Sequence, residues 1–155
     1  MIDYALVGRC GVFCGSCIVY RAFKDSNQLR EQIAKKQKCK VEDVRCDGCQ
    51  TVLESGWEIQ RQWGKNCRII KCLEGKGLKF CFECEIFPNC KNFQMIYKPY
   101  LKAHENLIEN LERIKTGEVK EWLAEEEKKW VCRECGNPIS DYEECHWCGA
   151  KLRTK

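Results

Sequence analysis

The sequence predicts a small, irregular α+β domain stabilised by metal, followed by a helical connector and a C-terminal zinc ribbon. Three observations predict it: 15 of the 155 residues are cysteine, other hydrophobic residues are few, and one long cysteine-free stretch has helical periodicity. Without cysteine, the hydrophobic share falls from 44% to about a third, which is thin for a conventional core. Structural zinc sites supply roughly 10–16 kcal/mol each and can replace missing burial. The expected domains are residues 1–96, 97–130 and 131–155.

The cysteine spacing favours metal over disulfides. In a C-x2-C turn both sulfurs point at one place, which suits tetrahedral zinc. An odd cysteine count also leaves one thiol unpaired in a disulfide scheme. The first twenty residues lack the apolar segment of a signal peptide, so we expect a cytoplasmic protein with reduced thiols. The five C-x2-C pairs are Cys14/Cys17, Cys46/Cys49, Cys81/Cys84, Cys132/Cys135 and Cys145/Cys148.

The N-terminal domain is expected to bind two metal ions. The intervening segment is short enough to fold back as one loop and group four of its cysteines, which are Cys46, Cys49, Cys67 and Cys72. The second group is expected to be Cys14, Cys17, Cys84 and either Cys81 or Cys90, with Cys10 as a competitor. This second set stays open, because C-x2-C pairs can interleave freely. Cys39 lies outside every pair and is the cysteine least expected to bind metal.

Helical patterns occupy three stretches. The first runs from about Asp25 to Lys38, with Ser26 as its N-cap, and a second, shorter one covers Ile69–Lys76. Between Lys98 and Trp130 two amphipathic helices are expected, separated at Gly117. The first of these two has its apolar residues at Leu101, Leu107, Ile108, Leu111 and Ile114.

The last 25 residues carry the zinc ribbon signature. Two C-x2-C knuckles, each followed by glycine, are expected to bind one Zn²⁺ through Cys132, Cys135, Cys145 and Cys148. His146 lies inside the second knuckle, where the ligand positions are already filled, and is expected to face solvent. His104, the other histidine, is expected on the exposed flank of a helix. Because no set of histidines and carboxylates leaves an open zinc position, we do not expect hydrolytic zinc chemistry or an enzyme.

Several cysteine motifs in one order also resemble a known family. These motifs are Gly8-Arg-Cys-Gly-Val-Phe-Cys-Gly-Ser-Cys17, Cys46-Asp-Gly-Cys49, Cys67 through Cys72 to Gly77, and Cys81-Phe-Glu-Cys84-Glu-Ile-Phe-Pro88. Together they resemble the uncharacterised prokaryotic family catalogued as domain of unknown function 3795, over roughly residues 8–95. The C-terminal stretch is similar to the zinc ribbon that some members carry. The resemblance implies a metal-binding domain and no established activity.

Iron is the alternative metal for the N-terminal domain. The spacing Cys10-x3-Cys14-x2-Cys17 matches that of radical S-adenosylmethionine enzymes, but those need a partial barrel of alternating strands and helices, which the sequence does not show. An iron–sulfur cluster without that fold remains an alternative, because four cysteines can bind either metal. An iron–sulfur redox protein or a thiol-based enzyme is therefore the alternative to a zinc protein.

The net charge of the chain helps to predict whether its partner is a protein or a nucleic acid. The chain carries +4 at pH 7, but three zinc centres, each about −2 with four thiolates, change this to about −2. The basic clusters Lys35-Lys36-Gln37-Lys38 and Lys151-Leu-Arg153-Thr-Lys155 are short and are expected to be solvated surface. No apolar run is long enough for a membrane span. The sequence thus predicts a non-catalytic multi-zinc module with about three sites and a protein partner, nucleic acid being the alternative partner; it indicates no oligomeric state.

Overall fold

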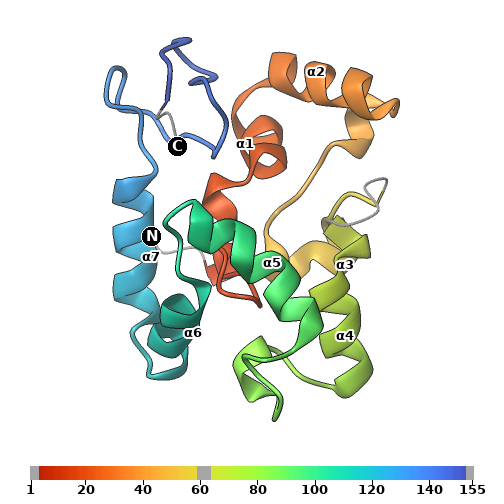
Figure 1. Ribbon diagram of the computed structural model, residues 1–155. Coiled ribbons are helices and arrows are strands. Elements are labelled where there is room, and N and C mark those ends of the chain that lie inside the picture. Colours follow the sequence, from red (N-terminus) through yellow and green to blue (C-terminus); the bar gives the residue numbers. More distant parts are fainter. Residues whose placement is uncertain (1–3, 59–63, 153–155) are drawn as a thin grey trace.

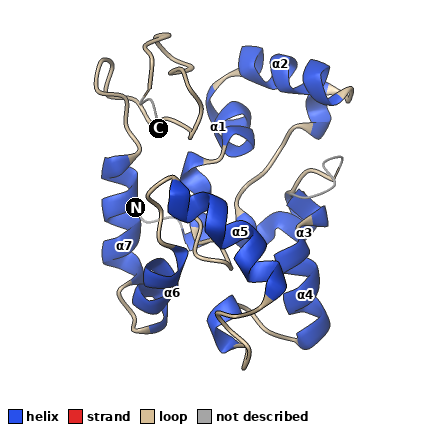
Figure 2. Ribbon diagram, viewed as in Figure 1, coloured by secondary structure: helices blue, strands red, loops and turns tan. Residues whose placement is uncertain are grey.

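The protein is helical (Figures 1 and 2). The computed structural model describes residues 4–58 and 64–152, and these ranges contain no strand. The α+β prediction is therefore wrong. The described residues contain isolated antiparallel bridges instead, Val7 to Phe13, Val131 to Pro138 and Glu144 to Lys151. The cysteine turns reverse the chain so tightly that only one residue pair bridges each of them.

Seven α-helices form the described part of the chain. They are α1 (Ile18–Asp25), α2 (Asn27–Gln37), α3 (Val52–Ser55), α4 (Arg68–Lys76), α5 (Lys91–Lys102), α6 (Leu107–Lys115) and α7 (Val119–Lys129). Short 3-10 turns lie between them: η1 (Tyr4–Leu6), η2 (Cys14–Ser16), η3 (Val41–Asp43), η4 (Cys49–Thr51), η5 (Gly64–Asn66) and η6 (Cys81–Glu83). None of these described helices has the length and apolar content needed to cross a membrane.

Three of these helices begin directly after a cysteine. Cys17, Cys67 and Cys90 are the N-caps of α1, α4 and α5. The first N–H groups of a helix have no partner within it and attract negative charge. Burial raises the pKa of the Cys67 thiol, and the backbone N–H groups of Ile70 and Ile69 oppose that rise. At Cys67 the N–H groups of the helix start thus offset part of the effect that burial has on the thiol.

The helices that the sequence predicts are present. Ser26 accepts a hydrogen bond from the Leu29 N–H at 3.2 Å and starts α2, while Gly77, at φ +66°, ends α4. Gly117, at φ +92°, separates α6 from α7. The prediction for Leu101 is wrong. This residue belongs to α5 and is exposed, so it is not part of the apolar face of α6.

The two helices of the predicted connector pack into the core. Leu111 of α6 is fully buried in a cluster with Cys10 and Cys81. Trp122 of α7 is 1% exposed and meets the edge of Phe13 at a ring distance of 6.3 Å. In Figure 1, α6 and α7 lie along one side of the molecule beside the N-terminal turns. Helix α5 runs across residue 96, and the division into three domains remains a prediction.

Candidate metal centres

The C-terminal knuckle pair, residues 131–152, brings its four cysteines together. The Sγ atoms of Cys132, Cys135, Cys145 and Cys148 all lie within 4.8 Å of one another. The distances from Cys132 to Cys148 and from Cys135 to Cys145 are 3.7 and 3.8 Å. Four sulfurs on a tetrahedron at about 2.3 Å from zinc are about 3.8 Å apart. The spacing of these thiols therefore fits one zinc ion.

Both knuckles fold in the same way. The N–H of Gly136 donates to the Cys132 carbonyl, and the N–H of Gly149 donates to the Cys145 carbonyl, each at 2.8 Å. Both glycines have positive φ, +73° and +76°, which other residues rarely adopt. The backbone N–H of Cys135 lowers the pKa of the Cys132 thiol to about 7. The turn therefore favours the thiolate of Cys132, the form that binds zinc.

His146 is buried, and the prediction that it faces solvent is wrong. Its side chain is 5% exposed, and its Nε2 lies 2.9 Å from Oδ2 of Asp25 on α1. Arg21 approaches the same carboxylate at 3.5 Å. The physical reason is that the knuckle pair packs against α1, where the Asp25 carboxylate is within hydrogen-bond distance of His146. His104 is exposed, as predicted, but it lies in the turn after α5 rather than on a helix.

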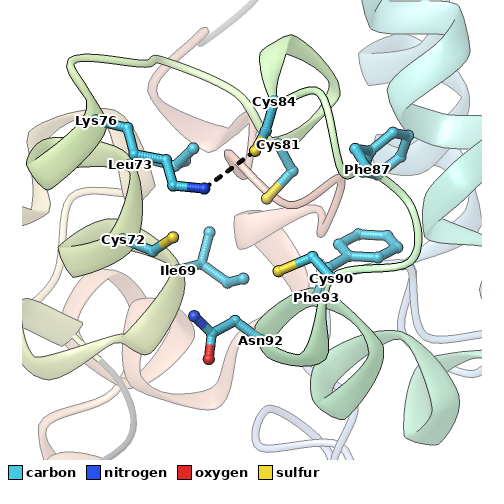
Figure 3. A pocket seen from close by; sticks show the side chains of 10 residues that line it. All are labelled: Ile69, Cys72, Leu73, Lys76, Cys81, Cys84, Phe87, Cys90, Asn92 and Phe93. Atoms are coloured by element: carbon cyan, nitrogen blue, oxygen red, sulfur yellow. Dashed lines mark hydrogen bonds between the residues drawn. The ribbon is translucent and has the colours of Figure 1, made fainter.

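A second group of four cysteines surrounds a small cavity of about 20 Å³ (Figure 3). We call this the small cavity; its cysteines are Cys72, Cys81, Cys84 and Cys90. Figure 3 shows their thiols around one space, reached from α4, from η6 and its following turn, and from the start of α5. Lys76 donates a hydrogen bond from Nζ to Sγ of Cys84 at 3.2 Å. Burial raises the pKa of Cys81 to about 12.

The six remaining predicted ligands line a larger cavity of about 440 Å³. They are Cys10, Cys14, Cys17, Cys46, Cys49 and Cys67. A side-chain hydrogen bond with Cys14 lowers the pKa of Cys49 to about 7. The backbone N–H of Arg9 also donates to the Cys49 sulfur at 3.4 Å. Both contacts favour the thiolate of Cys49 over its thiol.

The structure groups the cysteines differently from the predicted sets. Cys72 lies in the small cavity, while Cys46, Cys49 and Cys67, with which it was grouped, line the larger one. Five residues along α4 correspond to a rotation of about 140° around the helix axis, so Cys67 and Cys72 face different ways. Cys14 and Cys17 line the larger cavity together with Cys10, the competitor for their site, whereas Cys81, Cys84 and Cys90 line the small one. Which cysteines share a metal remains a prediction.

Sulfur spacing distinguishes the knuckle pair from both cavities. Among the described residues, no other group of three potential ligands has its atoms within 4.8 Å of one another. Cys39 lines neither cavity and packs beside the cluster of Val19, Ala34, Val44 and Trp57. Lys76 was missed from sequence, although its position four residues after Cys72 on a helix puts both on one face.

These features define a cysteine-rich helical protein with a four-cysteine group that can hold a metal ion. The profile of the family described as "Protein of unknown function (DUF3795)" matches residues 6–95, more than half of the chain, and the chain belongs to that family. The resemblance seen in the cysteine motifs is thereby confirmed. The matched region contains the cysteines of both cavities, whereas the knuckle pair lies outside it. No curated protein and no solved structure matches the chain.

Proposed function

We propose that this is a non-catalytic metal-binding module of the cytoplasm, with zinc in the C-terminal knuckle pair and a protein as its partner. The observation that carries the proposal is the 3.7 and 3.8 Å separation of the knuckle sulfurs, which is the edge of a zinc–thiolate tetrahedron. Structural zinc sites use four protein ligands and leave no position for a substrate. Four cysteines here fill that set.

The surface of the knuckle pair supports a protein partner. Val131, Tyr142 and Trp147 are exposed there at 37%, 53% and 45%, and aromatic residues are enriched in protein interfaces. Nucleic acid binding instead needs clustered positive charge. Of the second basic cluster, Arg153 and Lys155 lie outside the described residues. A net charge of about −2, which the chain would carry with three four-cysteine zinc centres, would oppose phosphate binding.

Zinc content tests the metal part of this proposal. The full chain with Cys135→Ser should lose one zinc ion per chain relative to the wild type, because three thiolates bind zinc more weakly than four. Cys39→Ser is the matched control and should lose none. Equal zinc content in the Cys135→Ser protein and the wild type would contradict a zinc site in the knuckle pair.

A salt titration tests the partner. Binding of the metal-loaded chain to arbitrary duplex and single-stranded oligonucleotides should be undetectable or weak even at low salt. Micromolar binding that weakens steeply as salt rises would indicate phosphate neutralisation and would replace the protein partner by nucleic acid.

An iron–sulfur redox protein is the second candidate function. The larger cavity favours it, because six cysteines line about 440 Å³ of space and a cluster needs thiolates with room for iron and sulfide between them. The absence of strands in residues 4–58 and 64–152 argues against a radical S-adenosylmethionine barrel. Electron transfer without such a barrel needs only a bound cluster. Visible absorption of anaerobically purified protein would distinguish this function from a zinc-only protein.

A further inference from the structure

We propose that Cys14, Cys17, Cys46 and Cys49 together hold one metal centre in the larger cavity, formed where two C-x2-C turns of the chain meet. This centre is separate from the zinc site of the proposed function. If its metal is iron, it supplies the ligands that the second candidate function needs. Four thiolates select soft metals, which in proteins are zinc, copper(I) and iron–sulfur clusters.

The two C-x2-C turns are held against each other by contacts that do not involve their thiols. Phe13, directly before Cys14, pairs with Val7 in an antiparallel bridge. Gln50, directly after Cys49, donates a hydrogen bond from Nε2 to the Val7 carbonyl at 2.7 Å. Val7 therefore joins the start of the first turn to the end of the second. The fold thus brings together two turns that are far apart in the sequence.

The thiols of the two turns lie beside each other in pairs. Cys14 and Cys49 share a side-chain hydrogen bond, so the first cysteine of one turn meets the last cysteine of the other. Cys17 and Cys46 both pack against the buried cluster around Val44. Burial raises the pKa of Cys46 to about 11, and Cys17 is the thiol that adds most to this rise. The second pair therefore also joins opposite turns.

The C-terminal knuckle pair has the same arrangement. There too the first cysteine of each turn lies beside the last cysteine of the other, Cys132 beside Cys148 at 3.7 Å and Cys145 beside Cys135 at 3.8 Å. Two C-x2-C turns that meet in this way direct four sulfurs at one place. No three sulfurs of the larger cavity lie within 4.8 Å of one another. The turns must therefore move closer together to bind a single ion, whereas a cluster would occupy the space between them.

Each of the four sulfurs accepts a hydrogen bond from a backbone N–H group. The N–H groups of Cys49, Tyr20, Gly48 and Arg9 donate to the sulfurs of Cys14, Cys17, Cys46 and Cys49, respectively. Such donors orient a thiolate ligand and stabilise its charge. Burial raises the pKa of Cys17, and the N–H groups at the start of α1 oppose that rise. A cation bound between the thiols favours the thiolate form much more strongly.

Cys10 and Cys67 line the same cavity but pack into a different part of the core. Cys10 is buried in one apolar cluster with Cys81 of the small cavity, and Cys67 packs against that cluster. Neither of them belongs to a C-x2-C turn. Two complete C-x2-C turns already supply the four ligands of one centre. The ligand set is therefore complete without Cys10 and Cys67.

Graded metal removal from the wild-type chain tests the ligand set. The full chain is purified anaerobically, and its zinc, iron and sulfide are measured. It is then treated with increasing amounts of a chelator, and at each step the free thiols are alkylated and identified by mass spectrometry. Cysteines that share a metal lose it together, so Cys14, Cys17, Cys46 and Cys49 should become reactive in the same step. If Cys46 and Cys49 react together with Cys67 and before Cys14, the proposed set is wrong.

Double variants test the same set by the additivity of metal loss. Two cysteines that bind one centre can lose it only once, so Cys14→Ser combined with Cys46→Ser should contain as much metal as either single variant. Cys14→Ser combined with Cys135→Ser should lose the sum of the two single losses, because the knuckle pair binds its own ion. Cys39→Ser is the matched control and should lose none. Circular dichroism of each variant separates loss of metal from unfolding.

The outcomes separate this inference from the functions proposed above. Loss of one zinc ion in each of the four single variants supports the ligand set with zinc as its metal. Loss of about four iron atoms together with sulfide supports the same set and the second candidate function. If Cys135→Ser loses zinc and none of the four variants loses metal, the proposed function stands and this inference fails. Full metal content in Cys14→Ser, with loss in both Cys46→Ser and Cys67→Ser, would also overturn it.

Discussion

The side chains of His146 and Asp25 form a buried hydrogen bond between segments 121 residues apart in the sequence, with Nε2 and Oδ2 separated by 2.9 Å. A backbone hydrogen bond from Asp141 to the Ser16 carbonyl, also 2.9 Å, joins the same two regions. Figure 1 shows the C-terminal segment beside α1. Asp141 also lines the larger cavity together with Cys17. The knuckle pair is thus docked against the cysteine-rich part of the chain.

Breaking this pair should loosen the knuckle pair. Asp25→Ala leaves His146 buried beside Arg21 without its carboxylate, and an unsatisfied buried polar group costs about 1–3 kcal/mol. Hydrogen exchange in residues 131–152 should accelerate accordingly in the metal-loaded protein. Glu74→Ala is the control: it removes an exposed partner of Arg9, and exposed pairs contribute less than about 1 kcal/mol. Equal exchange in both variants would show that the pair does not dock the knuckle.

Removing all metal should affect the chain unevenly. In residues 4–58 one small buried cluster, Val19, Ala34, Val44 and Trp57, is joined to short turns between cysteines. If metal holds those turns, this region should lose hydrogen-exchange protection when a chelator strips its metals. Helices α6 and α7 carry buried apolar residues such as Leu111 and Leu123 and should keep part of their helical signal. Unchanged exchange in residues 4–58 after metal removal would show that metal does not stabilise this region.

The knuckle pair could be predicted from the sequence because its determinants are local. Two C-x2-C turns and their glycines fix the sulfurs within a few residues of each other. The grouping of the N-terminal cysteines depends instead on helix rotation, as for Cys67 and Cys72, and on which helices pack together. Sequence spacing alone does not contain either quantity.

Two helices escaped prediction for a related reason. The usual start signals of a helix are Ser, Thr, Asp and Asn, but α1 and α5 begin after Cys17 and Cys90. Because cysteine is not among the usual N-cap residues, a search for those residues does not find these two helix starts. The α+β prediction failed because the segments between the cysteines form short 3-10 turns and isolated bridges rather than strands.

The carboxyl group of Glu126 should give the stability of the fold an unusual pH dependence. Burial raises the pKa of this α7 carboxyl group, although the Trp130 Nε1–H donates to it at 3.0 Å. Because the folded pKa lies above the unfolded one, the contribution of Glu126 is most favourable when it is protonated and is lost as pH rises through the folded pKa. Glu126→Gln should therefore raise the melting temperature at pH 7, with a smaller gain near pH 4.

Glu125 is the neighbouring control with the opposite sign. Its hydrogen bond to Arg113 lowers its pKa, so its contribution is present above the unfolded pKa and is lost as pH falls through the folded one. Glu125→Gln should slightly lower the melting temperature at pH 7 and leave it unchanged at low pH. Parallel pH profiles for the two variants would contradict the burial argument.

The turn between Cys46 and Cys49 should require glycine at position 48. Gly48 separates Cys46 from Cys49 at φ +111°, and a Cβ atom there would lie 2.1 Å from the Ala5 carbonyl oxygen. Both the positive φ and the clash oppose a side chain, and such backbone strain alone costs of order 1–3 kcal/mol. Gly48→Ala should lower the free energy of unfolding by at least that amount and reduce metal content.

Gly75→Ala is the matched control, because Gly75 lies within α4 with nothing within 4 Å of the added atom. Alanine in an open helix position is favoured over glycine by roughly 0.5–1 kcal/mol, so that variant should be slightly more stable with full metal content. If the two variants unfold at the same denaturant concentration, the close approach of Gly48 to Ala5 does not hold the ligand turn in place.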